Sequence, residues 1–153
     1  MEIRAARLSD ADAIAGCVRL AYGKYIARIG REPKPMSADY AQAVAAHQVW
    51  VVDGVVDGGA GLAAVLELIP QDAHLLIENI AVDPARQGGG LGRRLMAFAE
   101  AEARRQGFHE LRLYTNETFV ENIAFYGRLG YLVTKREPYK ESAIVFMSKS
   151  LAG

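Results

Sequence analysis

Hydrophobic positions along the chain follow two periods, and the changes between them divide the sequence into strands and helices. Alternating or short continuous apolar runs are typical of strands, whereas apolar residues three and four apart are typical of amphipathic helices. The first pattern predicts strands over residues 2–8, 49–53, 61–69, 73–82, 110–114, 131–139 and 142–150. The second predicts helices over residues 11–29, 38–46, 91–106 and 118–129.

Short polar residues and glycines mark the expected ends of these elements. Ser9 or Asp10 is expected to cap the first helix and Ser37 the second. Gly107 follows the long third helix as its expected C-terminal cap. Residues 54–59 are expected to form the turn between two strands. The resulting order is β-α-α-β-β-β-α-β-α-β-β, which predicts an α/β (α+β) fold with a mixed sheet flanked by helices.

Composition narrows the class of protein. The sequence has no internal repeat and no linker-like segment, so a single domain is expected over residues 1–153. Eighteen basic and eighteen acidic residues cancel, so no long-range attraction to nucleic acid or to a membrane is expected. With no apolar stretch of membrane-spanning length and no signal peptide, a cytoplasmic protein is expected. Cys17 excludes an intramolecular disulfide and is expected in the core, and the scattered histidines predict no metal site.

The segment "ARQGGGLGRRL", residues 85–95, places four glycines between a strand and the long helix. A helix N-terminus exposes unpaired N–H groups, and glycine allows a ligand to approach the backbone closely. With Arg86, Arg93 and Arg94 beside them, these groups favour binding of an anion, most often a phosphate. The alternative is a glycine-rich surface turn that precedes an ordinary basic helix.

Two familiar nucleotide motifs do not match this segment. A Walker loop ends in Gly-Lys-Ser/Thr, whereas this one ends in "GRR" and supplies no hydroxyl for magnesium. A Rossmann G-x-G-x-x-G pattern fails because its third glycine would fall on Arg93 or on Leu95. A third pattern, Q/R-x-x-G-x-G/A, matches residues 87–92.

With "ENIAVDPA" before it and "RRLMAFAEAEARRQG" after it, this third pattern closely resembles the coenzyme A signature of the GCN5-related N-acetyltransferase (GNAT) family. The segment "ENIAFYGRLGY", residues 121–131, resembles that family's second motif, in which a helix carries a tyrosine ahead of Leu-Gly-aromatic. The expected order of strands and helices is similar to the family's over nearly the whole chain. The resemblance therefore implies a GNAT-like domain and an N-acetyltransferase that uses acetyl-CoA as co-substrate.

The resemblance also implies where acetyl-CoA binds. Its pyrophosphate would lie on backbone groups at the helix start, and its pantetheine arm would pair with the preceding strand, which must separate from its neighbour there. Many members place an asparagine seven residues before the tyrosine, where this chain has Phe119, and the nearby asparagines are Asn116 and Asn122. The implied cofactor contacts are Ile80, Ala81, Val82, Gln87, Gly88, Gly89, Gly90, Leu91, Gly92, Arg93, Asn122 and Tyr126.

The implied reaction is direct attack of a primary amine on the thioester in a ternary complex. Tyr126 occupies the motif's tyrosine position and is the expected acid for the departing thiolate, the alternative being a core tyrosine. Glu78 is the expected base or ammonium-binding carboxylate, because a charge on a central strand needs a role, although a structural role is the alternative. Strand alternation predicts that Glu78, Ile80 and Val82 share one face. Glu67 is a second candidate base.

Two loops, residues 28–40 and 135–142, are expected to select the acceptor, since their acidic and aromatic side chains would suit a cationic amine. A small-molecule amine is favoured, and a peptide amine at a protein N-terminus or a lysine is the alternative. Another alternative is a non-catalytic module that binds acetyl-CoA as a sensor or partner subunit. The closing hairpin offers edge strands through which two copies could form a homodimer.

Overall fold

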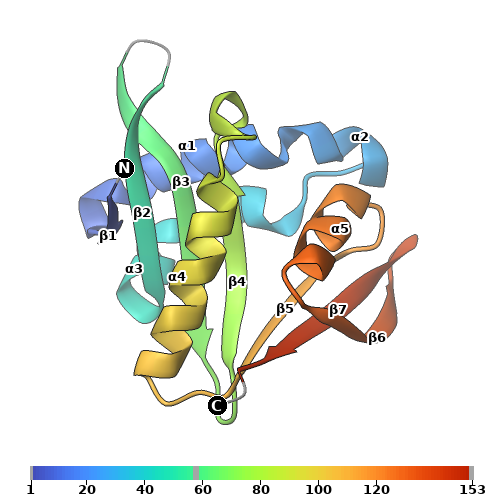
Figure 1. Ribbon diagram of the computed structural model, residues 1–153. Helices are drawn as coiled ribbons and strands as arrows, with labels where there is room; N and C mark the ends of the chain where they lie inside the picture. The colour runs from blue at the N-terminus through green and yellow to red at the C-terminus, as the bar shows by residue number, and fades with distance from the viewer. Residues whose placement is uncertain (1, 57–58, 152–153) are drawn as a thin grey trace.

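A seven-stranded mixed sheet forms the centre of the computed structural model, which describes residues 2–56 and 59–151 (Figure 1). The strands are β1 (Ile3–Ala5), β2 (Gln48–Val56), β3 (Gly59–Pro70), β4 (Leu75–Val82), β5 (Glu110–Asn116), β6 (Leu132–Tyr139) and β7 (Ser142–Ser150). They lie in the order β1-β2-β3-β4-β5-β7-β6. β4 and β5 are parallel, and the other neighbouring strands are antiparallel.

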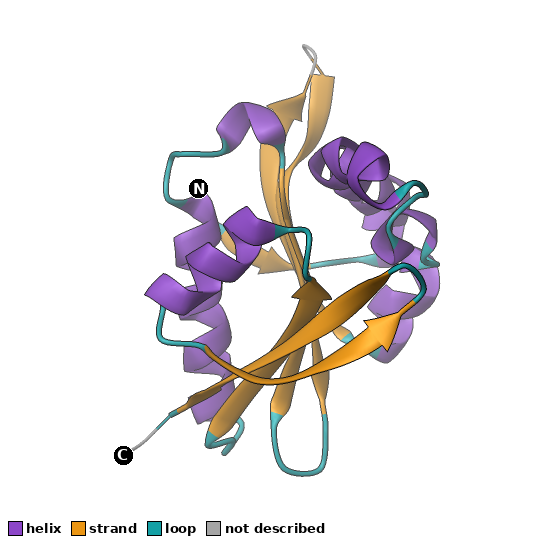
Figure 2. Cartoon of the chain, turned by 90° about the vertical axis from the view of Figure 1, so that its right-hand side faces the viewer, coloured by secondary structure: helices purple, strands orange, loops and turns teal. Residues whose placement is uncertain are grey.

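Helices cover both faces of the sheet, as the side view in Figure 2 shows. They are α1 (Ala11–Tyr22), α2 (Ile26–Ile29), α3 (Tyr40–Ala46), α4 (Leu91–Arg105) and α5 (Val120–Arg128). Leu66 belongs to the core cluster under α4 and α5, whereas its neighbour Val65 belongs to the cluster under α1 and α3. β2, β3 and β4 therefore contribute side chains to both cores. Within the described residues, no helix is long and apolar enough to span a membrane.

This architecture confirms the predicted fold class and the predicted order of the long elements. The core position of Cys17 is also confirmed, because it lies in the cluster under α1 and α3 with 4% of its surface exposed. Gly107 follows α4 in the left-handed conformation, with φ 86°, as expected for a residue that ends a helix.

The first helix is interrupted, which corrects the continuous helix predicted over residues 11–29. A 3-10 turn at Gly23–Tyr25 separates α1 from α2, and Gly30 ends α2 with a φ of 71°. Tyr25 is only 3% exposed, and its hydroxyl donates to Asn122 of α5. The interruption therefore coincides with a tertiary contact that the helical period does not encode.

The start of the first helix agrees with the prediction, and the start of the second differs from it. Asp10 occupies the N-cap position of α1, as predicted, although its carboxylate binds the guanidinium of Arg4 and no N–H group of that helix. Ser37 lies in a 3-10 turn, and Asp39 caps α3 by accepting a hydrogen bond from the backbone N of Gln42 at 3.1 Å. The correction at α3 arises because two short polar residues, Ser37 and Asp39, both precede the helix.

The end of the first strand and the turn between the second and third strands also differ from the predictions. The strand predicted over residues 2–8 shortens to β1, because Leu8–Asp10 forms a 3-10 turn. The turn predicted over residues 54–59 is shorter than expected, because β2 extends to Val56 and β3 begins at Gly59. The part of that turn at residues 57–58 lies outside the described residues.

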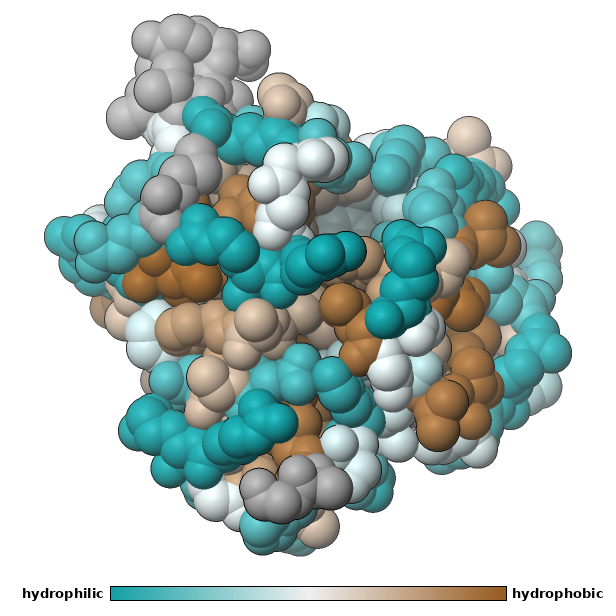
Figure 3. All heavy atoms as spheres, viewed as in Figure 1, coloured by the Kyte–Doolittle hydropathy of each residue, from teal (hydrophilic) through white to brown (hydrophobic). Residues whose placement is uncertain are grey.

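Hydrophobic side chains reach the surface on the side of the molecule where α5, β6 and β7 lie (Figure 3). β6 is exposed along its whole length and forms the edge of the sheet, whereas β7 lies between β5 and β6. Leu132 is 73% exposed and Val133 is 52% exposed. Only β6 of the closing hairpin therefore offers a free edge, and a homodimer through it stays a prediction.

Candidate active site

The sheet opens between β4 and β5. These strands pair over Leu75–Ile77 and Leu111–Leu113, and in the described residues their pairing stops there. β4 continues for five more residues beside β3, while β5 continues beside β7. Residues 78–82 therefore have a neighbouring strand on one side only, which is the separation that the resemblance to the GNAT family implied for a pantetheine arm.

A β-bulge interrupts β4 at this opening. Ile77 and Asn79 pair with consecutive residues of β3, so Glu78 between them has no partner there. Ile77 and Ile80 both pack against the cluster under α4, which strict alternation would not allow. Since the extra residue shifts the alternation, Glu78 does not share a face with Ile80 and Val82. The prediction of a common face for these three side chains is wrong.

A groove of about 580 Å³ lies beside this part of β4. It extends over the start of α4 to α5 and to the end of α1. Gly88 and Gly90 have φ values of 88° and 83°, which residues with side chains rarely adopt. Gly89 borders an adjoining pocket. The predicted cofactor residues that line the groove are Ile80, Ala81, Val82, Gln87, Gly88, Gly90, Leu91, Gly92, Arg93, Asn122 and Tyr126.

The start of α4 gives this groove the chemistry of an anion site. Arg94 donates its backbone N–H to the carbonyl of Gly90 at 3.0 Å, and the three N–H groups before it lack acceptors in the helical pattern. Arg86 and Arg93 also line the groove. A Cβ at Gly54 would lie 3.0 Å from the Arg86 guanidinium, so this glycine makes room for the arginine. Backbone donors and positive charge therefore converge where a phosphate was predicted.

Tyr126 lies on α5 and lines the same groove. Its ring packs against Phe125 and Tyr131, with centroid distances of 5.5 and 6.2 Å, and the residue is 7% exposed. Burial raises the pKa of Tyr126, and the neighbouring Tyr25 adds to the effect. The hydroxyl therefore stays protonated near neutral pH and can donate a hydrogen bond or a proton into the groove.

Phe119 and Asn122 both contact Tyr25, which links the α1–α2 segment to α5. The rings of Tyr25 and Phe119 stack with centroids 3.9 Å apart, and the Tyr25 hydroxyl donates to Asn122 Oδ1 at 3.3 Å. Arg28 pairs with Glu121 at 2.5 Å beside them, and its hydrogen bonds lower the pKa of Glu121 to about 2. Phe119 is thus an apolar contact, and Asn122 reaches the groove as a partner of Tyr25.

The two candidate carboxylates have different surroundings. Glu78 accepts a hydrogen bond from the hydroxyl of Tyr114 and lies two residues from Ile80, which lines the groove. Glu67 is 5% exposed and binds His47 Nδ1 at 2.6 Å, and burial raises the pKa of Glu67. Neither carboxylate is among the residues that line the groove, and Glu78 is the nearer of the two to the lining residues along β4. In the described part of the chain, no group of three potential metal ligands is present.

Two residues without a predicted role, Tyr22 and Asn79, form a hydrogen-bonded chain beside the bulge with Tyr40, which belongs to the predicted acceptor loop. Tyr22 donates to Asn79 Oδ1 at 3.0 Å, and Asn79 Nδ2 donates to the Tyr40 hydroxyl at 3.0 Å. Tyr40 in turn donates to the carbonyl of Pro35 at 2.6 Å. The available signal was a second polar residue, Asn79, next to Glu78 in the middle of an apolar strand, but the partners of Asn79 lie far away in sequence.

Several known proteins with similar sequences or structures are acetyltransferases. The model of the Acetyltransferase (GNAT) family matches residues 10–131. N-alpha-acetyltransferase 80 of Mus musculus is 43% identical over 77 residues, which are 50% of this chain and 22% of that protein. The chain spans about half or less of the length of the curated relatives that it matches.

Two solved structures share the fold at low sequence identity. The PaiA N-acetyltransferase of Thermoplasma acidophilum in complex with coenzyme A has a TM-score of 0.79 and 18% identity, covering 97% of this chain and 98% of that one. An aminoglycoside 6'-N-acetyltransferase complexed with coenzyme A has a TM-score of 0.74 and 16% identity, covering 100% of this chain and 98% of that one.

Proposed function

The chain belongs to the acetyltransferase (GNAT) family, and from that premise we propose that it transfers the acetyl group of acetyl-CoA to a primary amine. The observation that carries the proposal is the groove beside the open side of β4, which ends at the glycine-rich start of α4. One cavity thus combines a strand edge for the pantetheine arm with backbone donors for the pyrophosphate.

The cofactor is proposed to bind through both ends of this groove. The pyrophosphate accepts hydrogen bonds from the backbone N–H groups of residues 88–93, with Arg86 and Arg93 nearby, whereas the Gln87 N–H donates to the Pro84 carbonyl. The pantetheine arm pairs with the backbone of Ile80–Val82, where β4 has no partner on the β5 side in the described residues. Asn122 is proposed to contact the arm from α5, since it lines the opposite wall.

The proposed chemistry is a direct attack in a ternary complex. The amine must first lose a proton, and Glu78 is proposed to accept it, directly or through a water. The amine nitrogen then bonds to the acetyl carbon, and an N–H group of the open strand stabilises the negative oxygen of the tetrahedral intermediate. The carbon–sulfur bond breaks, and Tyr126 donates a proton or a hydrogen bond to the departing thiolate.

The acceptor is proposed to be a small-molecule amine, and a peptide amine is a second candidate. The two segments expected to select the acceptor, the loop after α2 and the β6–β7 hairpin, contact each other. The Arg31 guanidinium lies 5.6 Å from the ring centre of Tyr139. Such a contact encloses a small acceptor more readily than a long peptide. The second candidate is supported by the match to a mouse protein named as an N-alpha-acetyltransferase.

Calorimetric titration of the full chain with acetyl-CoA tests the proposal. The dissociation constant of acetyl-CoA is expected to be on the order of 10⁻⁶ M or lower, and dephospho-coenzyme A and ATP are expected to bind more weakly. No binding, or a preference for ATP, would reject the acetyltransferase assignment of the groove. A screen of small amines and peptides with detection of the released thiol follows. Binding without turnover against any amine would favour the non-catalytic module.

A further inference from the structure

Tyr22, the last residue of α1, forms part of the groove wall at the bulge. Its hydroxyl donates to Asn79 Oδ1 at 3.0 Å and lies 3.5 Å from the carbonyl oxygen of Ile80. Ile80 is one of the residues proposed to pair with the pantetheine arm. The ring of Tyr22 therefore stands beside the last stretch of β4 that the cofactor would follow.

Several contacts hold this ring in one orientation. Asn79 is 4% exposed and uses its amide to bind Tyr40, whose own hydroxyl binds the carbonyl of Pro35 at 2.6 Å. The Tyr22 ring also meets the ring of Tyr25 edge to face, with centroids 6.0 Å apart. A ring fixed at both its hydroxyl and its edge cannot move aside without leaving a buried amide unpaired.

The direction of the cofactor brings its acyl group to this ring. If the pyrophosphate lies at residues 88–93, which follow β4, the arm runs back along the strand from Val82 toward Ile80. The thioester at the end of the arm then arrives at the bulge. Tyr25 and Tyr126 also line the groove, but the Tyr25 hydroxyl binds Asn122 of α5 and Tyr126 itself lies on α5. Tyr22 instead contacts β4 at the bulge, through Asn79 and Ile80, so its ring is the one that the end of the arm meets.

Building on the proposed function, we propose that Tyr22 is the end wall of the acyl subsite and restricts the donor to acetyl-CoA. A propionyl or butyryl chain would have to overlap the ring or displace it from Asn79. Overpacking of this kind is unfavourable when the neighbours are fixed. Tyr22 is thus a specificity-determining residue, separate from the groups proposed to move protons.

Calorimetry with acetyl-, propionyl- and butyryl-CoA tests this role without knowledge of the acceptor. The unmodified chain is expected to bind butyryl-CoA about tenfold or more weakly than acetyl-CoA. Tyr22→Ala is expected to bring the two affinities within about threefold of each other. Tyr22→Phe keeps the ring and is expected to keep most of the discrimination. Leu20→Ala is the matched control, because Leu20 lies on the same helix with 48% of its surface exposed.

The titrations distinguish failure of the proposed role of Tyr22 from failure of the proposed function. Equal affinities in the unmodified chain, or undiminished discrimination in a Tyr22→Ala variant that still binds acetyl-CoA, would overturn the inference. An equally large loss of discrimination between acetyl-CoA and butyryl-CoA in Tyr22→Phe or Leu20→Ala would overturn it as well, since neither substitution removes the ring. If Tyr22→Ala does not fold, Tyr22→Leu shortens the wall and carries the same expectation. Absence of binding to any acyl-CoA would instead reject the proposed function.

Discussion

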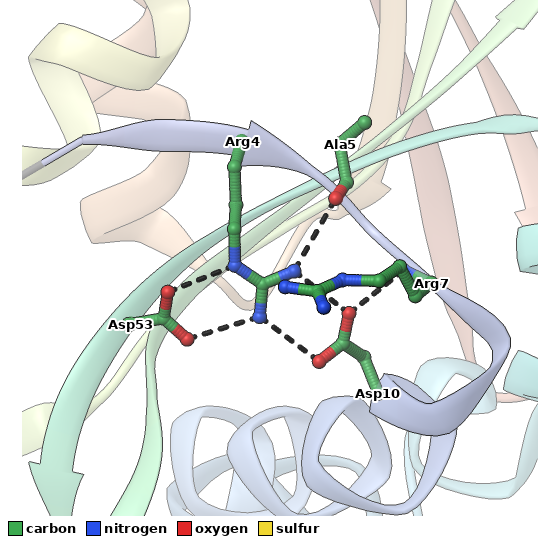
Figure 4. A network of polar contacts seen from close by, with 5 residues as sticks. All are labelled: Arg4, Ala5, Arg7, Asp10 and Asp53. Carbon is green, nitrogen blue, oxygen red and sulfur yellow. Dashed lines mark hydrogen bonds and ion pairs between the residues drawn. The ribbon is translucent and has the colours of Figure 1, made fainter.

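Two polar networks of similar size lie in different regions of the molecule and differ in charge. Near the N-terminus, the Arg4 guanidinium binds the carboxylates of Asp10 and Asp53 at 2.8–3.0 Å and the carbonyl of Ala5 at 3.3 Å (Figure 4). This network links β1 to β2 and to the turn before α1. Beside the bulge of β4, Tyr22, Asn79 and Tyr40 form a chain of neutral groups.

The difference teaches what each network can contribute. The charged network depends on pH through its carboxylates, and its residues do not line the groove. The neutral network keeps the same hydrogen bonds across the ordinary pH range and supplies a wall of the groove through Tyr22. We therefore expect substitutions near the groove to change binding and turnover, and substitutions near Arg4 to change stability alone.

The largest expected effect is on the groove side, from Gly90→Asp. A carboxylate at the start of α4 would face the pyrophosphate, so acetyl-CoA affinity is expected to fall on the order of 100-fold, measured by calorimetry. Gly90→Asn is the matched control, because asparagine has the same shape without the charge and tolerates the left-handed φ of 83° equally well. Equal losses in both variants would mean that backbone strain, not charge, weakens binding.

Tyr126→Phe should produce the next largest effect. Removal of the hydroxyl is expected to lower turnover about 30-fold while acetyl-CoA affinity changes by less than about threefold. The two values come from thiol-release kinetics with an identified amine and from calorimetry. A parallel loss of turnover and affinity would make Tyr126 a binding residue and would contradict its proposed role toward the thiolate.

On the other side of the comparison, Arg4→Gln is expected to lower stability without affecting acetyl-CoA affinity. Hydrogen bonds from Arg4 lower the pKa of Asp10 from 3.8 to about 2. Because this pKa is depressed in the folded chain, the stabilisation is present above pH 4 and is lost as pH falls toward 2. It amounts to about 1–2 kcal/mol.

Urea unfolding of both chains between pH 7 and pH 2 measures this contribution. The difference in unfolding free energy between the unmodified chain and Arg4→Gln should shrink as the solution is acidified. A difference that stays constant with pH would show that Arg4 acts through packing of its side chain. A fall in the acetyl-CoA affinity of Arg4→Gln at pH 7 would show that the charged network also affects binding, and would contradict the contrast drawn between the two networks.

The smallest expected effect on stability comes from Glu121→Gln, on the groove side. Arg28 and Glu121 form an ion pair whose side chains are 36% and 43% exposed, so water screens their attraction. The unfolding free energy is expected to change by less than about 1 kcal/mol, as measured by urea unfolding. A larger loss would indicate that the pair is needed to hold the Tyr25 segment against α5.

The sequence by itself determined the parts of this protein that depend on neighbouring residues. Hydrophobic periods predicted the long strands and helices, because burial of one face of an element repeats every few residues. The glycines of residues 88–92 predicted an anion site, because the conformational freedom of a glycine and the free N–H groups of a helix start are local properties. Tyr126 followed from its motif, and the structure brings it into the same groove.

The tertiary structure alone decided which side chains meet at the bulge. A single extra residue in β4 reversed the face of Glu78, and no local pattern encodes a bulge that depends on pairing with β3. Tyr22 and Asn79 are 57 positions apart, and Tyr25 and Asn122 are 97 apart. Such contacts arise only when helices pack on the sheet, so their residues carry no signal beyond their own apolar or polar character.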